Sequence, residues 1–306
     1  MNVKALLLGS IFMSIPAYCL HPVSVSCLAS LRGVSLHKSI DVNETREATS
    51  VAYYPDDYKI GEERDLMIYL HGFGSKPENY GNSGLGAAFE KERLQKGMQE
   101  PITLAIGLGP FVLAGSTEHG MHGANFVNPE LYWNVVLRFV ASHDLNIRNI
   151  FMLGNSGGSF SGMQMLRHQP KDFRVKAAMF HVLPTIRGES LLPLAKNVLS
   201  RDPAGAALRN QFEGKLSSIL KDEHFSELNM SLAHNLKEFP SDTAVLIQDG
   251  EYDAFRYIDE NIKLVVEAQL QGLTFFHHTL PRGGHSAPFD HDLALNFFKA
   301  MGNISN

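Results

Sequence analysis

Short runs of apolar residues alternate along this chain with longer stretches in which apolar residues recur every three or four positions. The short runs predict seven β-strands, at residues 49–54, 66–70, 102–107, 149–153, 177–181, 244–248 and 274–280. The longer stretches predict helices at residues 85–98, 129–143, 158–167, 255–270 and 289–301. Because continuous apolar strands that alternate with helices are typical of a sheet covered on both faces, we expect an α/β fold with a mostly parallel sheet.

Composition and charge narrow the classes of function open to this 306-residue chain. Residues of the set AVILMFWYC make up 44% and charged residues 19%, as in globular proteins rather than disordered chains. With 27 Lys+Arg against 32 Asp+Glu, the formal net charge is −5, and the basic residues form no stripe. Nucleic-acid binding is therefore not expected, because it depends on clustered basic side chains.

The amino terminus has the pattern of an export signal. Lys4 precedes an apolar run over residues 5–13, and small residues follow near residue 19. We therefore expect a signal peptide at 1–19, a mature domain at 20–306, and a secreted or periplasmic location. The apolar run is too short to span a bilayer, so stable membrane insertion is not expected.

The two cysteines, Cys19 and Cys27, both lie near this signal. Cys19 is an alternative lipid-attachment site, which bulky Tyr18 disfavours because a small residue is expected before such a cysteine. Cleavage after Cys19 would leave Cys27 alone, without an internal disulfide. Two cysteines are also too few for a structural zinc module.

A Gly-x-Ser-x-Gly motif at residues 154–158 follows an apolar strand and precedes a helix rich in small residues. A serine on a sharp strand-to-helix turn needs neighbours without bulk, and Gly154, Gly157 and Gly158 provide that space. The amide groups at the start of the helix would lie near the Ser156 hydroxyl, where they can stabilise an oxyanion. Taken alone, the pentapeptide fits an ordinary tight turn equally well.

The partners that a nucleophilic serine requires appear downstream. A hydroxyl needs a base, and the base needs an orienting carboxylate. The apolar strand at 244–247 leads into a turn that contains Asp249 and Asp253, and Gly-Gly-His follows at 283–285 after one more helix and strand. The order Ser156, Asp253, His285 is the order expected of such a triad on a parallel sheet. Asp249 is the rival acid, closer to the strand.

These motifs together resemble the α/β-hydrolase superfamily. The resemblance rests on residues 154–158, the Gly-Glu-Tyr-Asp turn at 250–253, the Gly-Gly-His at 283–285 and the strand end at 68–74, and it covers roughly residues 45–300. Within the superfamily, the chain is most similar to the group of esterase D, feruloyl esterases and polyhydroxyalkanoate depolymerases. It lacks the triple glycine of one lipase type. The resemblance implies that the backbone N–H groups of Phe73 and Gly157 form the oxyanion hole.

About sixty residues separate the strand ending near residue 183 from the strand starting at 244, far more than a connection needs. Leucine-rich helical patterns occupy this segment. In the superfamily that it resembles, an insertion at this point usually forms a cap, so we expect a helical cap at about 185–240. The alternative is that these apolar faces only pack against the sheet.

Other candidate residues have simpler expected roles. His119 and His122 have a spacing that suits a metal, but no third ligand has a defined position, so a loop bordering the site is the better prediction. His71 is expected to support its loop, and Trp133 to pack in the core. His277 and His278 should face opposite sides of a strand, and the Asp-His-Asp sequence at 290–292 should cap a helix.

The sequence thus predicts an exported serine hydrolase that cleaves carboxylic esters, with Ser156, Asp253 and His285 as its catalytic triad. No cofactor or metal is expected, and the partner is a small-molecule or polymeric ester substrate. The alternatives are a peptidase on the same fold and a catalytically inactive, hydrolase-like binding protein.

Overall fold

The computed structural model describes residues 34–40, 47–55, 57–72, 77, 80, 99–107, 129–184, 232–253, 258–285 and 289–302. Eight strands form one sheet: β1 (Val34–Ile40), β2 (Glu47–Tyr53), β3 (Glu63–Leu70), β4 (Ile102–Ala105), β5 (Asn146–Asn155), β6 (Val175–His181), β7 (Ala244–Gly250) and β8 (Phe275–Leu280). The described helices are α5 (Pro129–Ser142), α6 (Gly157–Arg167), η2 (Ala233–Glu238), α10 (Ile258–Leu270) and α11 (His291–Gly302).

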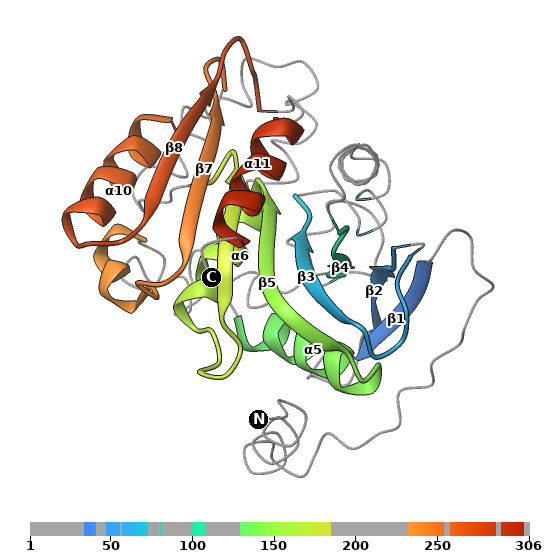
Figure 1. Cartoon of the computed structure of the whole chain (residues 1–306). Helices are drawn as coiled ribbons and strands as arrows, with labels where there is room; N and C mark the ends of the chain where they lie inside the picture. Colours follow the sequence, from blue (N-terminus) through green and yellow to red (C-terminus); the bar gives the residue numbers. More distant parts are fainter. Residues whose placement is uncertain are drawn as a thin grey trace.

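The strands lie in the order β1-β2-β4-β3-β5-β6-β7-β8 (Figure 1). β2 pairs antiparallel with both of its neighbours, and all the other pairings are parallel. The chain crosses from β4 over β3 to reach β5, so the direction of winding reverses between β3 and β5. In open parallel sheets, sites form at the carboxyl ends of the strands that flank such a reversal. The ends of β3 and β5 are thus the expected position of a site.

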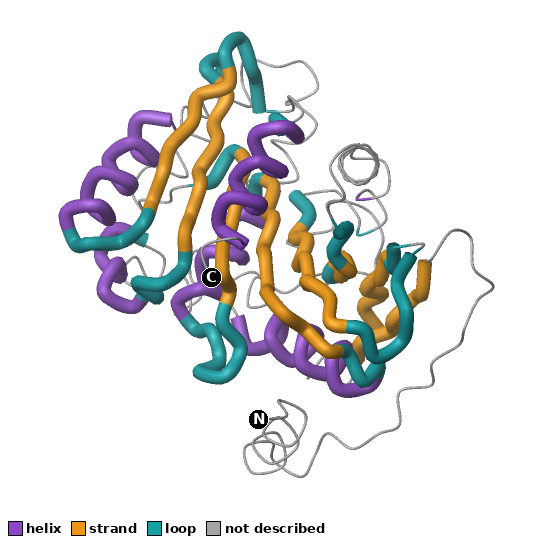
Figure 2. The backbone as a smooth tube through the Cα atoms, viewed as in Figure 1, coloured by secondary structure: helices purple, strands orange, loops and turns teal. Residues whose placement is uncertain are grey.

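Helices lie on both sides of the sheet (Figure 2), because buried residues of one strand alternate between two cores. On β3, Leu66, Ile68 and Leu70 pack on the side of α5, α6 and α10. Met67 and Tyr69 pack on the opposite side, where α11 lies. This alternation confirms the prediction of a sheet covered on both faces.

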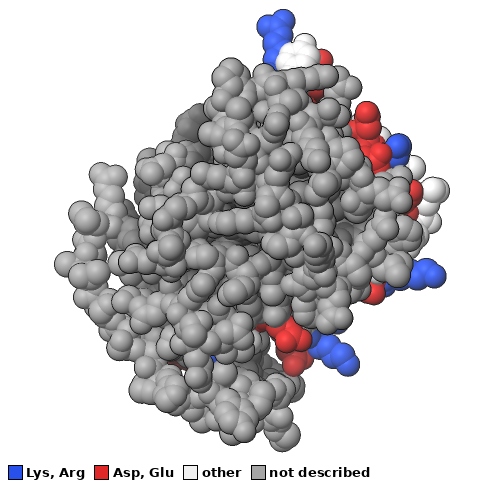
Figure 3. All heavy atoms as spheres, turned by 180° about the vertical axis from the view of Figure 1, so that it is seen from behind, with Lys and Arg blue, Asp and Glu red and all other residues white. Residues whose placement is uncertain are grey.

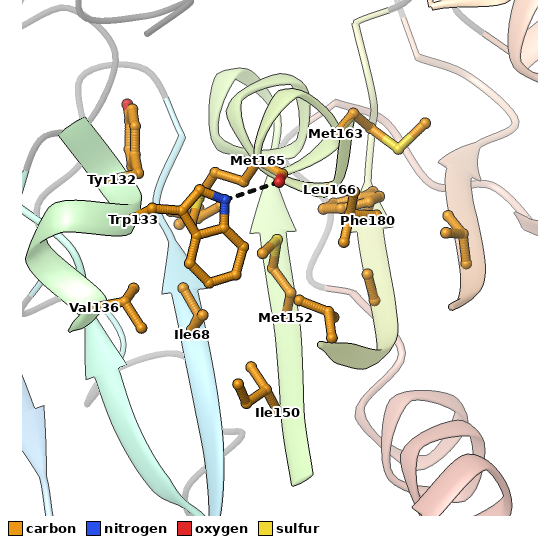
Figure 4. Close-up of a cluster of buried hydrophobic side chains, with 14 of the residues drawn as sticks. Ile68, Tyr132, Trp133, Val136, Ile150, Met152, Met163, Met165, Leu166 and Phe180 are labelled. Carbon is orange, nitrogen blue, oxygen red and sulfur yellow. Dashed lines mark hydrogen bonds between the residues drawn. The ribbon is translucent and has the colours of Figure 1, made fainter. Parts of the chain in front are cut away.

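Helix α6 lies buried between the sheet and α5, and Trp133 of α5 holds the two helices together. The indole Nε1–H of Trp133 donates to the carbonyl oxygen of Met165 at 2.9 Å, beside Ile68 and Met152 (Figure 4). The Tyr132 hydroxyl lies 3.3 Å from Ser161 Oγ of α6. The prediction that Trp133 packs in the core is confirmed, and the indole also fixes a backbone carbonyl of the helix that follows Ser156.

The predicted elements agree with the structure to within a few residues, except at the amino-terminal edge and in the undescribed ranges. β1 was not predicted, because its apolar residues are isolated by polar ones instead of forming a continuous run. The helix predicted at 85–98 lies outside the described residues. Of the predicted cap at 185–240, only residues 232–240 are described, and Leu232, Leu236 and Phe239 of this part are buried in the core.

Charges of both signs intermix on the described surface. On the face seen in Figure 3, acidic and basic side chains lie next to one another along the margin and do not gather by sign. Arg174 pairs with Asp242 at 2.5 Å, and Lys263 pairs with Glu260 at 3.0 Å. None of the helices in the described part of the chain has both the length and the apolar character that a membrane crossing requires.

Candidate active site

Ser156 lies on the sharp turn between β5 and α6. Its backbone has φ 51° and ψ −121°, a conformation that residues other than glycine rarely adopt and that is concentrated at functional sites. The turn is held from both sides: Ser156 N donates to the carbonyl oxygen of His181 at 2.8 Å, and Ser159 N donates to that of Ser156 at 2.8 Å. These two hydrogen bonds hold Ser156 in its strained conformation at the end of β5.

Close approach of α6 to the ends of β3 and β5 explains Gly158 and Gly154 of the motif. A Cβ atom at Gly158 would overlap the carbonyl oxygens of Leu70 and His71. A Cβ atom at Gly154 would lie 2.7 Å from the Cα atom of Ser159. Because both contacts are with backbone, a larger residue would displace the helix and the serine with it.

The structure brings Ser156, His285 and Asp253 into one chain of hydrogen bonds. Ser156 Oγ lies 3.0 Å from His285 Nε2, and His285 Nδ1 lies 3.0 Å from Asp253 Oδ2. The Asp253 carboxylate is fully buried, whereas 26% of the His285 side chain is exposed. Since an ionised carboxylate only accepts hydrogen bonds, the proton lies on Nδ1, and Nε2 of the neutral imidazole can accept from the serine hydroxyl.

The turn that carries the acid and the loop that carries the histidine brace each other. Tyr252 N donates to the carbonyl oxygen of Gly283 at 2.7 Å, and Glu251 N donates to that of Leu280 at 3.1 Å. A Cβ atom at Gly250 would lie 2.5 Å from the Gly283 carbonyl oxygen, so the two segments are in direct backbone contact. The relative position of Asp253 and His285 therefore depends on the ends of β7 and β8.

Asp249, the rival acid, has a different set of partners. Its two carboxylate oxygens lie 3.0 and 2.9 Å from Asn261 Nδ2, and Oδ2 lies 2.9 Å from His277 Nε2. The carboxylate within hydrogen-bond distance of His285 Nδ1 is that of Asp253. The alternation of side chains along β7 and β8 directs Asp249 towards α10 instead of the loop at 283–285.

Of the two predicted oxyanion donors, Gly157 is described and Phe73 lies outside the described residues. Gly157 is the first residue of α6, so its N–H has no acceptor within the helix and lies at the positive end of the helix dipole. The segment that leads to Phe73 passes beside the serine, since a Cβ atom at Gly72 would lie 3.3 Å from Ser156 Cβ.

The remaining candidates have structural partners or lie outside the described ranges. His71 Nδ1 lies 2.9 Å from the carbonyl oxygen of its neighbour Gly72. Asp290 caps α11, as predicted, because its Oδ1 accepts from Leu293 N at 2.9 Å. His119 and His122 are not among the described residues, and within these residues no three His, Cys, Asp or Glu side chains gather as metal ligands would.

Comparison with known proteins finds solved structures that are similar to this chain in fold but not in sequence. No family model matches the chain, and no curated protein matches it. An esterase from the Planctomycetes species Thermogutta terrifontis superposes with a TM-score of 0.60 at 12% identity, covering 92% of this chain and 97% of the esterase. A ferulic acid esterase gives a TM-score of 0.59 at 12% identity, covering 89% and 98%. An S-formylglutathione hydrolase from Staphylococcus aureus gives 0.57 at 12% identity, covering 88% and 99%.

The chain has the α/β-hydrolase fold. The sheet order and the antiparallel β2 agree with this assignment, and so does the near-complete coverage of the similar structures. Identities this low show the shared fold and leave the chemistry to be argued from the site itself.

Two features of this hydrolase fold near Ser156 were not predicted from the sequence. Val182, directly after β6, has φ 46° and is buried, an unusual conformation for a β-branched residue. Asn261 is a fully buried amide on the inner face of α10, beside Leu264 and Val265. Asn261 could have been noticed in the sequence, because it is a polar residue on the apolar face of a helix. The turn at Val182 has no comparable sequence signal.

Proposed function

We propose that this protein is an exported serine hydrolase that cleaves carboxylic esters through an acyl-enzyme. Ser156 is the nucleophile, His285 is the general base and then the general acid, and Asp253 orients the imidazole. The observation that carries the proposal is the chain of hydrogen bonds from Ser156 through His285 to Asp253, built on a strained strand-to-helix turn.

In the first half-reaction, Ser156 Oγ attacks the ester carbonyl carbon while His285 Nε2 takes the hydroxyl proton. The tetrahedral intermediate collapses as the bond to the alcohol oxygen breaks, and the proton on Nε2 passes to the departing alkoxide. The acyl group remains on Ser156 as an ester. Asp253 keeps the Nδ1 proton in place and stabilises the imidazolium that forms between these steps.

In the second half-reaction, water takes the place of the alcohol. His285 Nε2 removes a proton from water while the water oxygen attacks the acyl carbonyl carbon. When the carboxylic acid leaves, His285 passes this proton to Ser156 Oγ. The N–H groups of Gly157 and Phe73 are the proposed donors to the oxyanion in both halves, each worth about 3–4 kcal/mol of transition-state stabilisation. These steps require no cofactor or metal.

The similar structures support esters as the substrate class. The Thermogutta terrifontis esterase has been solved with butyrate bound and with propionate bound. Fold-level likeness by itself does not set the chemistry, so the triad geometry carries the argument and the neighbours add to it.

Labelling with a fluorophosphonate probe tests this function directly, because the probe reacts preferentially with an activated serine. We expect the folded protein to be labelled on Ser156 and to hydrolyse p-nitrophenyl butyrate. Both signals should disappear in Ser156→Ala and after heat denaturation, while circular dichroism of Ser156→Ala stays unchanged.

Other results of these assays would favour one of the alternative functions. Labelling without ester hydrolysis, together with rapid cleavage of peptide anilides, would indicate the peptidase. Absence of both labelling and turnover would indicate an inactive, hydrolase-like binding protein. Activity that is lost with a chelator and restored by zinc would contradict the proposed mechanism and direct attention to His119 and His122.

A further inference from the structure

A second polar cluster lies beside the proposed triad, on the side of the sheet that α10 covers. Its members are Asp249 of β7, Asn261 of α10 and His277 of β8. The Asp249 carboxylate is fully buried and lies within 3.0 Å of Asn261 Nδ2 and 2.9 Å of His277 Nε2. Because a carboxylate accepts hydrogen bonds and cannot donate them, both nitrogens donate to it.

Asn261 also reaches the loop that follows β6. Its Nδ2, which carries two protons, donates to the carbonyl oxygen of Leu183 at 2.9 Å as well as to Asp249. Leu183 follows Val182, whose φ of 46° is strained for a β-branched side chain. The amide therefore fixes the residue that comes immediately after the strained position.

The same loop holds the nucleophile. His181, one residue before Val182, accepts from Ser156 N and from Ser159 Oγ with its carbonyl oxygen, both at 2.8 Å. Val182 N donates to the carbonyl oxygen of Gln248 at 2.7 Å, one residue before Asp249. Residues 181–183 thus connect the serine turn with the end of β7, where the turn bearing Asp253 begins.

Packing alone does not explain why Asp249 and Asn261 are polar. Buried amide and carboxylate groups cost free energy unless they are paired, and apolar residues of similar volume would fill the space at least as well. The Asn261 side chain adds directional hydrogen bonds that link the carbonyl of Leu183 to the carboxylate of Asp249. It thereby connects the loop after β6, which contacts Ser156, with β7, which leads to Asp253.

We propose that Asn261 is a positioning residue for hydrolysis at Ser156. By holding Leu183 against Asp249, it maintains the Val182 turn and, through His181, the orientation of Ser156 towards His285. This inference rests on the proposed function, and it concerns the geometry of the reacting serine and not the binding of substrate.

The exchange variant Asp249→Asn/Asn261→Asp separates positioning from packing. It keeps the volume and a hydrogen bond between positions 249 and 261, but it turns a carboxylate, which cannot donate, towards the carbonyl oxygen of Leu183. We expect kcat on p-nitrophenyl butyrate to fall at least tenfold with little change in KM. The rate of fluorophosphonate labelling should fall by the same factor.

Asp249→Asn alone is the matched control, because the amide oxygen at position 249 can still accept from Asn261, which also keeps its bond to Leu183. It should lower kcat less than threefold. Wild-type kcat and labelling rate in a folded exchange variant would overturn the proposal. An equal loss of kcat in the control and in the exchange variant would overturn it too, since the bond to Leu183 would then be irrelevant.

If circular dichroism shows that the exchange variant is unfolded, Asn261→Ala is compared with Leu264→Ala, a buried apolar neighbour on the same helix face. Both variants lose packing, but only Asn261→Ala loses the bond to Leu183. At a temperature where both are folded, Asn261→Ala should show the loss of kcat and Leu264→Ala should not. Equal kcat values would overturn the inference, whereas a wild-type protein without any activity would instead refute the proposed function.

Discussion

Asp249 and Asp253 lie close together at the end of one strand, yet their surroundings assign them different tasks. Asp253 faces His285 Nδ1, and Asp249 is occupied by Asn261 and His277. In the proposed mechanism the Asp253 carboxylate sets the tautomer of His285, whereas Asp249 contacts a different imidazole, that of His277, and the amide of Asn261.

Asp253→Asn is therefore expected to lower kcat by about 10³–10⁴, because an amide can offer an N–H to His285 and favour the wrong tautomer. Asp249→Asn should change kcat much less, as its partners can rearrange around an amide. Steady-state hydrolysis of p-nitrophenyl butyrate by both variants checks this. If the larger loss occurs at Asp249, the assignment of Asp253 as the catalytic acid is wrong.

Tyr69 is one of the buried tyrosines that make stability depend on alkaline pH. Burial raises the pKa of Tyr69 to about 12, whereas in the unfolded chain the phenol ionises near pH 10. The folded state thus holds this proton more tightly, and its contribution to stability is complete below pH 10 and is lost as pH rises towards 12.

Tyr69→Phe should remove this loss. The difference in free energy of unfolding between wild type and variant should shift by about 2–3 kcal/mol between pH 9 and pH 12, measured by urea denaturation. Tyr252→Phe, at an exposed site, is the control. Parallel pH curves for wild type and Tyr69→Phe would contradict the expectation.

At the scale of elements, α5 and α6 form the support under Ser156. Trp133→Phe removes the indole N–H that Met165's carbonyl accepts and leaves part of the indole's volume empty. We expect a loss of about 1–3 kcal/mol in free energy of unfolding, with kcat of the folded protein within about threefold of wild type. Because Trp133 is the single tryptophan, unfolding is followed by circular dichroism in the variant. A kcat loss with unchanged stability would contradict this expectation.

The role of the predicted cap can be tested by measuring esterase activity. Apolar surface from Phe73 and the leucine-rich insertion would favour longer acyl chains, because each buried methylene contributes about 0.8 kcal/mol, or about fourfold in kcat/KM. Activity on p-nitrophenyl esters should rise from acetate to butyrate or hexanoate.

Replacing residues 188–228 by a short Gly-Ser linker should flatten this preference. The deletion stops before Leu232, since Leu232, Leu236 and Phe239 pack in the core. A preference for acetate that survives the deletion would mean that the insertion contributes packing alone.

For the whole molecule, the amino-terminal pattern predicts export. When the full chain is expressed in a bacterial host, the protein recovered outside the cytoplasm should have lost about nineteen residues, as read from its intact mass. Lys4→Glu should reduce the amount that is exported, because the positive charge before the apolar run is part of the signal. An uncleaved protein in the cytoplasm would contradict the predicted location.

Much of the fold followed from local patterns. Continuous apolar runs located seven of the eight strands in the described part of the chain, because a strand buried on both faces has few polar positions. β1 was missed since its apolar residues alternate with polar ones, and such a short alternating segment is hard to distinguish from a loop.

The sequence by itself determined the residue types and the order of the site. Glycines around Ser156, a carboxylate after β7 and a histidine after β8 are local signals, because each depends on the conformation of a few adjacent residues. Only the tertiary structure decided that Asp253 and not Asp249 meets His285, that Val182 is strained, and that Asn261 joins the loop after β6 to β7. Those contacts join segments far apart in the chain, and their distances depend on how β6, β7, β8 and α10 pack together.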